Sequence, residues 1–314
     1  MRTYNPHLQM ARKDAIKDNQ KLFRIMSVER FLEMLAGDKN TLVRPSLWDD
    51  PFEKLINESA VLKDEQSSLK IIPAKFAESK LSADKWFGQC WSLEEESDAL
   101  WRVFTQNKIQ RSVKIVTTYG KLKESINGIE EGVVKFFIDR IAYPKSFKSS
   151  YGKALVEWME YYKQVGLPLE NLCELSLLLT KRYLFKHEKE VRLLAFVKDK
   201  NLLPNPHDNI YSYNYSVENN ITEVELDPWM PEYTKKIVSV VAMSKGLTVR
   251  ESQLSQEISP GKGILFEIRN SIKLHKTQYD GGHSKVFSFS YDGKGVEISN
   301  LANKKSMAKG KLKV

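Results

Sequence analysis

Short strand-like segments that alternate irregularly with helical ones constrain the fold of this chain more than any other feature. Residues 112–118 alternate in polarity and are rich in β-branched side chains, which is typical of a strand. After Ser27, which suits a helix N-cap, apolar side chains recur at helical spacing up to Gly37, namely Val28, Phe31, Leu32 and Leu35. An irregular mixture of these two patterns favours an α+β fold.

The remaining elements follow the same two patterns. Further strands are predicted at residues 21–26, 41–44, 86–91, 187–197, 210–216, 221–226, 237–242 and 286–291. Ser92 begins a capping-box sequence, Ser-Leu-Glu-Glu, and is predicted to open a helix that carries Leu100, Trp101 and Phe104. Other helices are predicted over residues 129–142, 154–165 and 170–183.

Composition places the chain among ordered, soluble proteins. Of its 314 residues, 41% are hydrophobic and 28% are charged, which is typical of a globular protein. No apolar run approaches the roughly 20 residues of a membrane helix, and the N-terminus lacks the apolar core of a signal peptide. We therefore predict a cytoplasmic protein without a membrane partner, built from a lead-in (residues 1–20), one domain (21–299) and a basic flexible tail (300–314).

Cysteine and histidine usage excludes several classes of site. The two cysteines, Cys90 and Cys173, are too few for a disulfide framework or a cysteine-rich zinc site. The five histidines lack metal-ligand spacing, and the sequence contains no GxGxxG, P-loop or GxSxG motif. These residues therefore predict no cysteine- or histidine-based metal site.

Positive charge is concentrated near the C-terminus. The formal net charge is +9, and residues 260–314 hold eleven Lys/Arg against four Asp/Glu, an excess of seven. Such a segment either forms a solvated tail or attracts a polyanion such as nucleic acid. Two rows of alternating aromatic residues are either core packing or platforms on which bases stack: Tyr211, Tyr213 and Tyr215, and Phe287, Phe289 and Tyr291.

The sequence Glu188-Lys189-Glu190-Val191-Arg192 is the strongest local signal for chemistry. In an extended strand Glu188, Glu190 and Arg192 share one face. Two carboxylates about 7 Å apart repel each other unless an arginine, a sugar diol or a metal binds them. The alternative is an exposed strand face with an Arg–Glu pair that contributes less than about 1 kcal/mol.

Three further positions are candidates. The loop Trp48-Asp49-Asp50-Pro51-Phe52-Glu53 combines three acids and two aromatic residues with a rigid proline, although Asp side chains also simply stabilise turns. Arg24 lies between apolar neighbours in the first strand, so it needs an anionic partner, either a carboxylate or a bound phosphate. Ser92 follows Cys90-Trp91, and helix capping alone would explain it.

Taken in order, these clusters resemble a bacterial family described as a domain of unknown function, number twenty-nine seventy-one. The resemblance covers roughly residues 21 to 245 and rests on four pieces: Leu22-Phe23-Arg24-Ile25 with the following helix; Asp49-Asp50-Pro51-Phe52-Glu53; Cys90-Trp91-Ser92 with Leu100-Trp101; and Lys181, Phe185 and Glu188-Lys189-Glu190-Val191-Arg192. The chain departs from the family pattern at Asp49, Phe185 and His187, where Asn, Trp and Tyr are usual.

More distantly, the family resembles ADP-ribosyltransferase toxins, including those that modify DNA. This resemblance implies a split mixed β-sheet flanked by helices, NAD as the substrate and no metal. It implies that Glu190 is catalytic, that Arg24 holds the pyrophosphate or the adjoining ribose of NAD, and that Ser92 supports Glu190 or the ribose. It also implies that Glu188 or Asp50 orients or deprotonates the acceptor, and that Trp48, Trp91 or Phe52 covers the nicotinamide.

The resemblance also implies a biological setting. It suggests a toxin-antitoxin or anti-phage system, with an antitoxin protein as partner. The basic C-terminal third and the aromatic rows tilt the acceptor toward nucleic acid, RNA or DNA, over a protein side chain.

Two other functions remain open from the residues. A metal-dependent nuclease could place Mg²⁺ among acids of the same clusters, namely Asp49, Asp50, Glu53, Glu188 and Glu190. That function would leave Arg24 and Ser92 without a role. A non-catalytic module could instead bind a partner through the same cleft.

Overall fold

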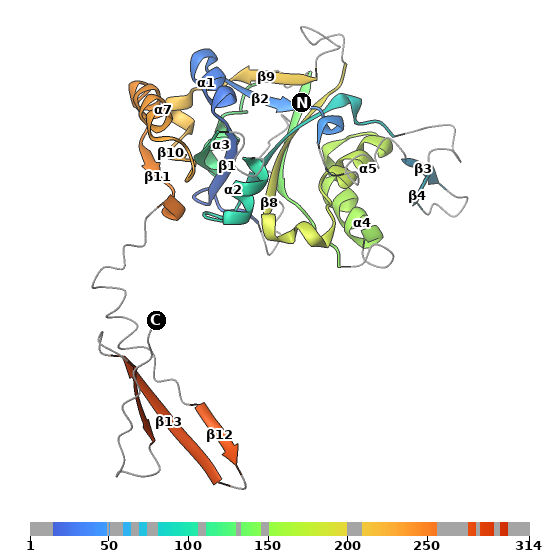
Figure 1. The fold of residues 1–314 in the computed structure, drawn as a ribbon. Helices are drawn as coiled ribbons and strands as arrows, with labels where there is room; N and C mark the ends of the chain where they lie inside the picture. The colour runs from blue at the N-terminus through green and yellow to red at the C-terminus, as the bar shows by residue number, and fades with distance from the viewer. Residues whose placement is uncertain are drawn as a thin grey trace. The chain divides into compact units, whose positions relative to one another are not determined.

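The protein forms two compact units, residues 1–255 and 256–314. The domain division predicted from the sequence, with one domain over residues 21–299, stays a prediction. The computed structural model describes residues 15–48, 50, 59–63, 69–73, 81–105, 111–129, 133–145, 151–199, 209–255, 276–280, 283–291 and 296–300. Within the second unit, β12 (Lys276–Asp280), β13 (His283–Tyr291) and β14 (Val296–Asn300) form an antiparallel sheet (Figure 1). The basic tail beyond residue 300 lies outside the described residues.

A nine-stranded mixed sheet forms the centre of the first unit. Its strands are β1 (Lys21–Ser27), β2 (Lys39–Val43), β5 (Trp86–Ser92), β6 (Ser112–Thr118), β7 (Val134–Arg140), β8 (Glu190–Val197), β9 (Ile210–Asn214), β10 (Glu223–Leu226) and β11 (Val249–Glu251). The order is β11-β10-β6-β1-β5-β2-β9, with β8 paired to β5 and β7 paired to β8. The β10–β11 pair is parallel and the other pairs are antiparallel.

The sheet is split at β5. This strand pairs with β8 along its whole length, from Trp86 opposite Phe196 to Ser92 opposite Glu190. It pairs with β1 only at Phe23–Ser92 and with β2 only at Val43–Gly88. The α+β class and the split mixed sheet flanked by helices are therefore confirmed.

Helices complete the unit: α1 (Val28–Gly37), α2 (Asp98–Phe104), α3 (Tyr119–Glu124), α4 (Tyr151–Tyr162), α5 (Leu169–Leu178), α6 (Val217–Asn220) and α7 (Glu232–Ser244). Short 3-10 turns lie between them: η1 (Pro45–Leu47), η4 (Ala83–Lys85), η5 (Lys163–Val165), η6 (Tyr183–Glu188) and η8 (Gln253–Ser255). A separate hairpin joins β3 (Ser59–Lys63) and β4 (Leu69–Pro73) (Figure 1). None of the helices in the described part of the chain has the length and apolar character of a membrane span.

Strand β8 is buried along its whole length because its two faces pack into different apolar cores. Val191 and Leu193 belong to the core that includes Phe31 of α1. Leu194 and Phe196 belong to the core that includes Trp158 of α4. The catalytic candidate Glu190 thus begins a strand that both cores hold in place.

Two predicted elements have the wrong type. The sequence predicts a helix over residues 129–142, but Val134–Arg140 is the strand β7, which pairs with β8 from Val134–Val197 to Arg140–Val191. The free edge of β8 needs hydrogen-bond partners, and this requirement outweighs the local helical pattern.

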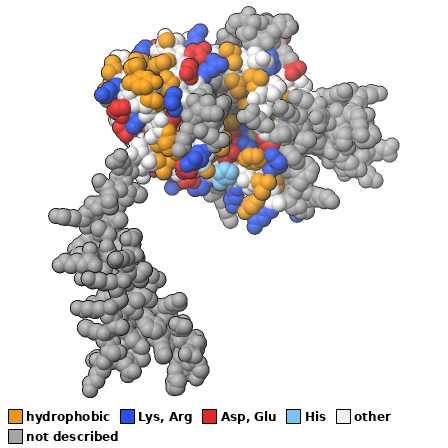
Figure 2. Space-filling view, viewed as in Figure 1, with side chains coloured by type: hydrophobic (Ala, Val, Ile, Leu, Met, Phe, Trp, Pro, Cys, Tyr) orange, Lys and Arg blue, Asp and Glu red, His pale blue; other side chains and the backbone are white. Residues whose placement is uncertain are grey.

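The sequence also predicts a strand over residues 237–242, but this segment lies within helix α7. Val238 and Ala242, four residues apart, pack inward as one helical face. Figure 2 shows apolar side chains gathered over α7, where Tyr233, Ile237, Val240 and Met243 are exposed. A run of β-branched residues that is apolar on both sides predicts a buried strand from sequence alone, although its tertiary contacts can make it a helix.

Candidate active site

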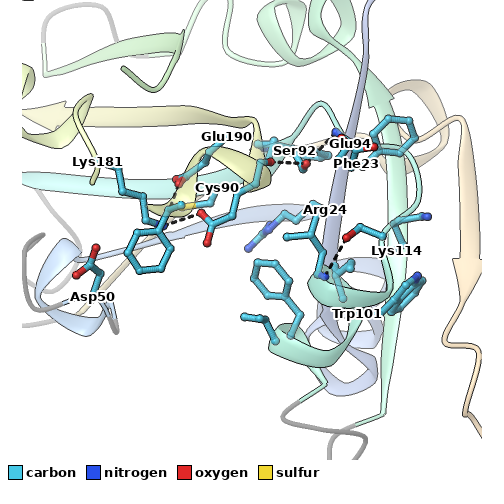
Figure 3. Close-up of a pocket in the computed structure, with 18 of the residues that line it drawn as sticks. Phe23, Arg24, Asp50, Cys90, Ser92, Glu94, Trp101, Lys114, Lys181 and Glu190 are labelled. Atoms are coloured by element: carbon cyan, nitrogen blue, oxygen red, sulfur yellow. Dashed lines mark hydrogen bonds and ion pairs between the residues drawn. The ribbon is translucent and has the colours of Figure 1, made fainter. Parts of the chain in front are cut away.

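Seven of the eight predicted site residues line one pocket of about 440 Å³: Arg24, Trp48, Asp50, Trp91, Ser92, Glu188 and Glu190 (Figure 3). The eighth, Phe52, lies outside the described residues, as do Asp49 and Glu53 of the same loop. The walls come from β1, β5, α2, η6, the start of β8 and the segment after η1. The pocket therefore gathers side chains that are more than 160 positions apart in the chain, from Arg24 to Glu190.

Glu190 is buried inside the protein, since only 4% of the residue is exposed. Arg192 donates from Nε to Oε1 at 2.5 Å and from Nη2 to Oε2 at 3.3 Å, and Lys181 donates to Oε2 at 3.2 Å. Burial raises the pKa of Glu190, but the charges of Arg192 and Lys181 outweigh burial and lower the pKa to about 2. Glu190 therefore carries its negative charge at neutral pH.

Glu188 lies beside Glu190, but not on the same strand as the sequence predicts. It ends η6, Lys189 takes a left-handed backbone (φ 44°), and β8 begins only at Glu190. Lys181 still links the two carboxylates, because its Nζ lies 2.7 Å from Glu188 Oε2 and 3.2 Å from Glu190 Oε2. Burial raises the pKa of Glu188, and the neighbouring negative charge of Glu190 adds to this rise, whereas Lys181 opposes it.

Ser92 holds the turn that carries both glutamates. The sequence predicts that Ser92 caps a helix, but α2 begins at Asp98 and its N-cap is Ser97. Ser92 Oγ instead donates to the carbonyl of Glu188 at 2.7 Å and accepts from the amide of Glu94 at 2.9 Å. Because β5 ends beside the start of β8, the serine ties the strand to the turn.

Arg24 is a desolvated cation with no carboxylate beside it in the described part of the chain. Among the described residues it forms neither an ion pair nor a hydrogen bond. Burial lowers its pKa to about 10, and the nearby Cys90 thiol opposes this only weakly. Figure 3 shows its side chain extending from β1 toward the side of the pocket where Lys181 and Glu190 lie. The anionic partner that the sequence analysis required of Arg24 is therefore not a protein carboxylate of the described chain.

The structure places the other predicted residues in supporting positions. The Trp48 ring lies over the Arg192 guanidinium, with 4.3 Å between Arg192 Cζ and the ring centroid. Asp50 is buried and accepts from Arg182 Nη2 at 2.7 Å. Trp91 is 2% exposed and donates its indole N–H to Gln89 Oε1 at 2.8 Å, so most of this ring belongs to the core.

Two further residues, Tyr143 and Lys114, shape the site and are not among those predicted from the sequence. Tyr143 accepts the backbone N–H of Glu190 at 2.9 Å, and nothing in its loop sequence indicates this contact. Lys114 lines the opposite end of the pocket, where its Nζ lies 2.7 Å from Glu225 Oε1 and 3.5 Å from Glu96 Oε2. A lysine between Val113 and Ile115 carries the same signal as Arg24, a charge between apolar strand residues, so the same reasoning could have found it.

The acids around Lys114 predict a pH-dependent stability. Burial and the adjacent Glu96 raise the pKa of Glu225 to about 7, against the opposing effect of Lys114. The other charged groups that face this cluster are Glu223, Glu95 and Arg250. A carboxyl whose folded pKa is raised stabilises the protein at low pH, and this contribution is lost as pH rises through about 7.

We therefore expect Glu225→Gln to lose less thermal stability than the wild type between pH 5 and pH 8. The melting temperature at each pH measures this difference. Glu232→Gln is the matched control, because the Glu232 side chain is 70% exposed. A Glu225→Gln variant whose melting temperature falls as steeply with pH as that of the wild type would contradict the assignment.

No group of three or more His, Cys, Asp and Glu side chains is arranged to hold a metal ion in the described ranges. The cations at Glu188 and Glu190 belong to the protein itself. Lys181 lies within ion-pair distance of both carboxylates.

No protein-family model matches the sequence, and no curated protein matches it. The resemblance to family number twenty-nine seventy-one therefore stays a prediction. The solved structure of Thermus sp. 2.9 DarT in complex with carba-NAD+ aligns with a TM-score of 0.32 at 9% identity, covering 76% of this chain and 97% of that chain. For Thermus sp. 2.9 DarT in complex with NAD+ the TM-score is 0.31 at 10% identity, covering 76% and 98%. These scores are too low to support an inference, so the functional proposal rests on the geometry of the site.

Proposed function

We propose that this protein is an NAD-consuming ADP-ribosyltransferase with toxin-like activity. One observation carries the proposal: a buried Glu190 whose pKa is lowered to about 2 and an Arg24 with no carboxylate partner among the described residues line the same aromatic-walled pocket. A pocket of about 440 Å³ is within the usual range for small-molecule sites, roughly 300–1000 Å³. A dinucleotide supplies a pyrophosphate anion for the arginine and a ribose hydroxyl that can donate to the carboxylate.

Glu190 suits the chemistry of the bond that breaks. When the bond between ribose C1′ and the nicotinamide nitrogen breaks, its electron pair leaves with neutral nicotinamide and the ribose becomes oxocarbenium-like. A preorganised carboxylate that accepts from the ribose 2′-hydroxyl stabilises this developing positive charge. Lys181 is closer to Glu188 than to Glu190, so it can release Glu190 Oε2 to the ribose while it keeps its ion pair with Glu188.

Arg24 suits the other end of the reaction. Its planar guanidinium donates in a fork that matches two phosphate oxygens, and a desolvated fork gains more from this contact than an exposed one. Ser92 is assigned a positioning role through the Glu188 carbonyl.

The two glutamates are proposed to have different catalytic roles, because their environments move their pKa values in opposite directions. Glu190 stays ionised and stabilises the transition state. Glu188, whose pKa is raised, accepts the proton of the acceptor group as the acceptor lone pair attacks ribose C1′.

This division predicts different pH profiles for two measurable steps. Transfer to the acceptor should slow as pH falls through the raised pKa of Glu188, because the base becomes protonated. Nicotinamide release should persist to lower pH, because Glu190 remains ionised. Parallel assays of nicotinamide release and acceptor labelling across pH 4 to 8 check this, and coincident profiles in Glu188→Gln and the wild type would contradict it.

We further propose a nucleic acid acceptor, RNA or DNA, inside the cytoplasm. The excess of eleven Lys/Arg over four Asp/Glu in residues 260–314 supports attraction to a polyanion. An enzyme that consumes NAD freely harms its own cell, so an antitoxin partner or a phage-triggered release is part of the proposal.

Incubation of the purified protein with NAD, with and without EDTA, tests the proposed function against its two rivals. Nicotinamide release that survives EDTA supports the transferase. Cleavage of nucleic acid that EDTA abolishes would support the nuclease, and the absence of both would support a binding module. Mass spectrometry of RNA, DNA and protein after the reaction identifies the acceptor.

A further inference from the structure

We propose that Trp48 is a positioning residue for Glu190: its ring fixes Arg192, and Arg192 in turn fixes the carboxylate. This inference rests on the proposed function, and it replaces the expectation that Trp48 covers the nicotinamide. It follows from contacts that link Trp48, Arg192 and Glu190 in series on one side of the pocket.

Arg192 has its hydrogen-bond donors committed in the plane of the guanidinium. Nε and Nη2 bond to Glu190, and Nη1 donates to the carbonyl of Leu178 at 2.6 Å. The residue is 1% exposed, so water does not compete for these donors. In-plane bonds do not prevent the guanidinium from tilting, and the Trp48 ring covers one of its faces at 4.3 Å.

Trp48 is itself held by a contact that requires glycine. A Cβ atom at Gly88 would lie 2.4 Å from Trp48 Cζ2 and 2.9 Å from Cη2, which is too close for any side chain. Gly88 lies on β5 at the single position where that strand pairs with β2, opposite Val43. The backbone of Trp48 is anchored as well, because its N–H donates to the Pro45 carbonyl at 3.1 Å. The Trp48 ring thus packs against the sheet at Gly88, and the ring held there restrains Arg192.

A ring in this position acts on the rate rather than on the affinity. Loss of the ring lets Arg192 tilt and moves the Glu190 oxygens away from the ribose hydroxyl, while Arg24 still holds the phosphates. Removal of a group that orients a catalytic ligand typically costs about 10- to 100-fold in activity. A ring that covered the nicotinamide would instead contribute to binding, and its loss would raise KM.

The test compares Trp48→Leu and Trp48→Phe with a matched control. Trp229 also lies over an arginine, with Arg102 Cζ at 5.1 Å from its ring, but it is not among the residues that line the pocket. We expect Trp48→Leu to lower kcat for nicotinamide release about 10- to 100-fold with KM for NAD within about twofold. Trp48→Phe should recover most of kcat, and Trp229→Leu should behave as the wild type.

A second variant reaches the same contact without removing the tryptophan. Gly88→Ala displaces the Trp48 ring from its packing position against the sheet, so this variant should reproduce the kcat loss of Trp48→Leu. In an Arg192→Lys background, Trp48→Leu should cost little more, because both changes act on one series of contacts. A rise in KM with unchanged kcat, or full additivity with Arg192→Lys, would overturn the proposal.

Carboxyl carbon NMR separates this inference from the proposed function, because it needs no NAD. With Glu190 assigned through Glu190→Gln, its titration should shift to higher pH in Trp48→Leu and remain near the wild-type position in Trp229→Leu. An unchanged titration in Trp48→Leu would refute the positioning role even if the wild type consumes NAD. A shifted titration in a protein that releases no nicotinamide would retain the positioning role and reject the transferase.

Discussion

Replacing Arg24 with methionine is expected to stabilise the ligand-free protein and to weaken its affinity for NAD. The guanidinium is desolvated and has no ion pair or hydrogen bond among the described residues, so its burial costs stability in the absence of a ligand. Methionine is unbranched and of similar length, so it fills the same space without a charge. The melting temperature should rise by about 2–4 °C for each kcal/mol recovered.

The same change removes the proposed phosphate contact. Hydrogen bonds to charged groups contribute about 1.5–3 kcal/mol each, so the Kd for NAD should weaken roughly 100-fold. Calorimetry or the thermal shift on adding NAD measures this loss. Arg24→Lys is the control, because it keeps the charge but loses the forked geometry. Its Kd for NAD should lie between those of the wild type and Arg24→Met. An Arg24→Met variant that is less stable than the wild type, or that binds NAD equally well, would contradict the assigned role.

Replacing Glu190 with glutamine should abolish nicotinamide release while the protein remains folded. Glutamine keeps the shape and one acceptor oxygen but cannot stabilise a positive charge, and loss of one electrostatic contact to a transition state typically costs about 100- to 1000-fold in kcat. The toxicity of the protein in a growing culture should disappear with it. Glu232→Gln, on the exposed start of α7, is the control for a neutralised glutamate outside the pocket.

Stability supplies a second readout for Glu190. A carboxylate whose folded pKa is lowered to about 2 stabilises the protein above its ordinary value of 4.5, and this contribution is lost as pH falls toward 2. Glu190→Gln should therefore be less stable than the wild type at pH 7, and the difference should shrink toward pH 3. Persistent toxicity in this variant, or full nicotinamide release, would reject Glu190 as the catalytic residue.

The sequence alone predicted the elements whose pattern and caps agree. Ser27 caps α1, its Oγ accepting from the Arg30 amide, and Gly37 ends the helix. The alternating residues 112–118 form β6 as predicted. Such elements are local, because spacing and capping depend on residues within a few positions of each other. The elements with the wrong type, β7 and α7, are those whose type depends on a distant partner.

The candidate site divides in the same way. Chemically unusual residues were visible in the sequence, because a charge between apolar neighbours or two close carboxylates needs an explanation wherever it lies. Of their partners, Arg192 was visible because it lies two positions from Glu190 on the same strand face, but the distant ones were not. Lys181 bonds to residues seven and nine positions away through the turn of η6, and Trp48 reaches Arg192 across 144 positions.

By itself, then, the sequence determined which side chains carry charge into the interior and which short stretches form strands or helices. The tertiary structure alone decided that Trp48 and Asp50 hold arginines, that Ser92 ties a turn, and that Arg24 lies opposite no carboxylate in the described chain. The physical reason is that burial and ion pairing are properties of a place in the fold. A place becomes defined only when strands far apart in the chain pair at one split in the sheet.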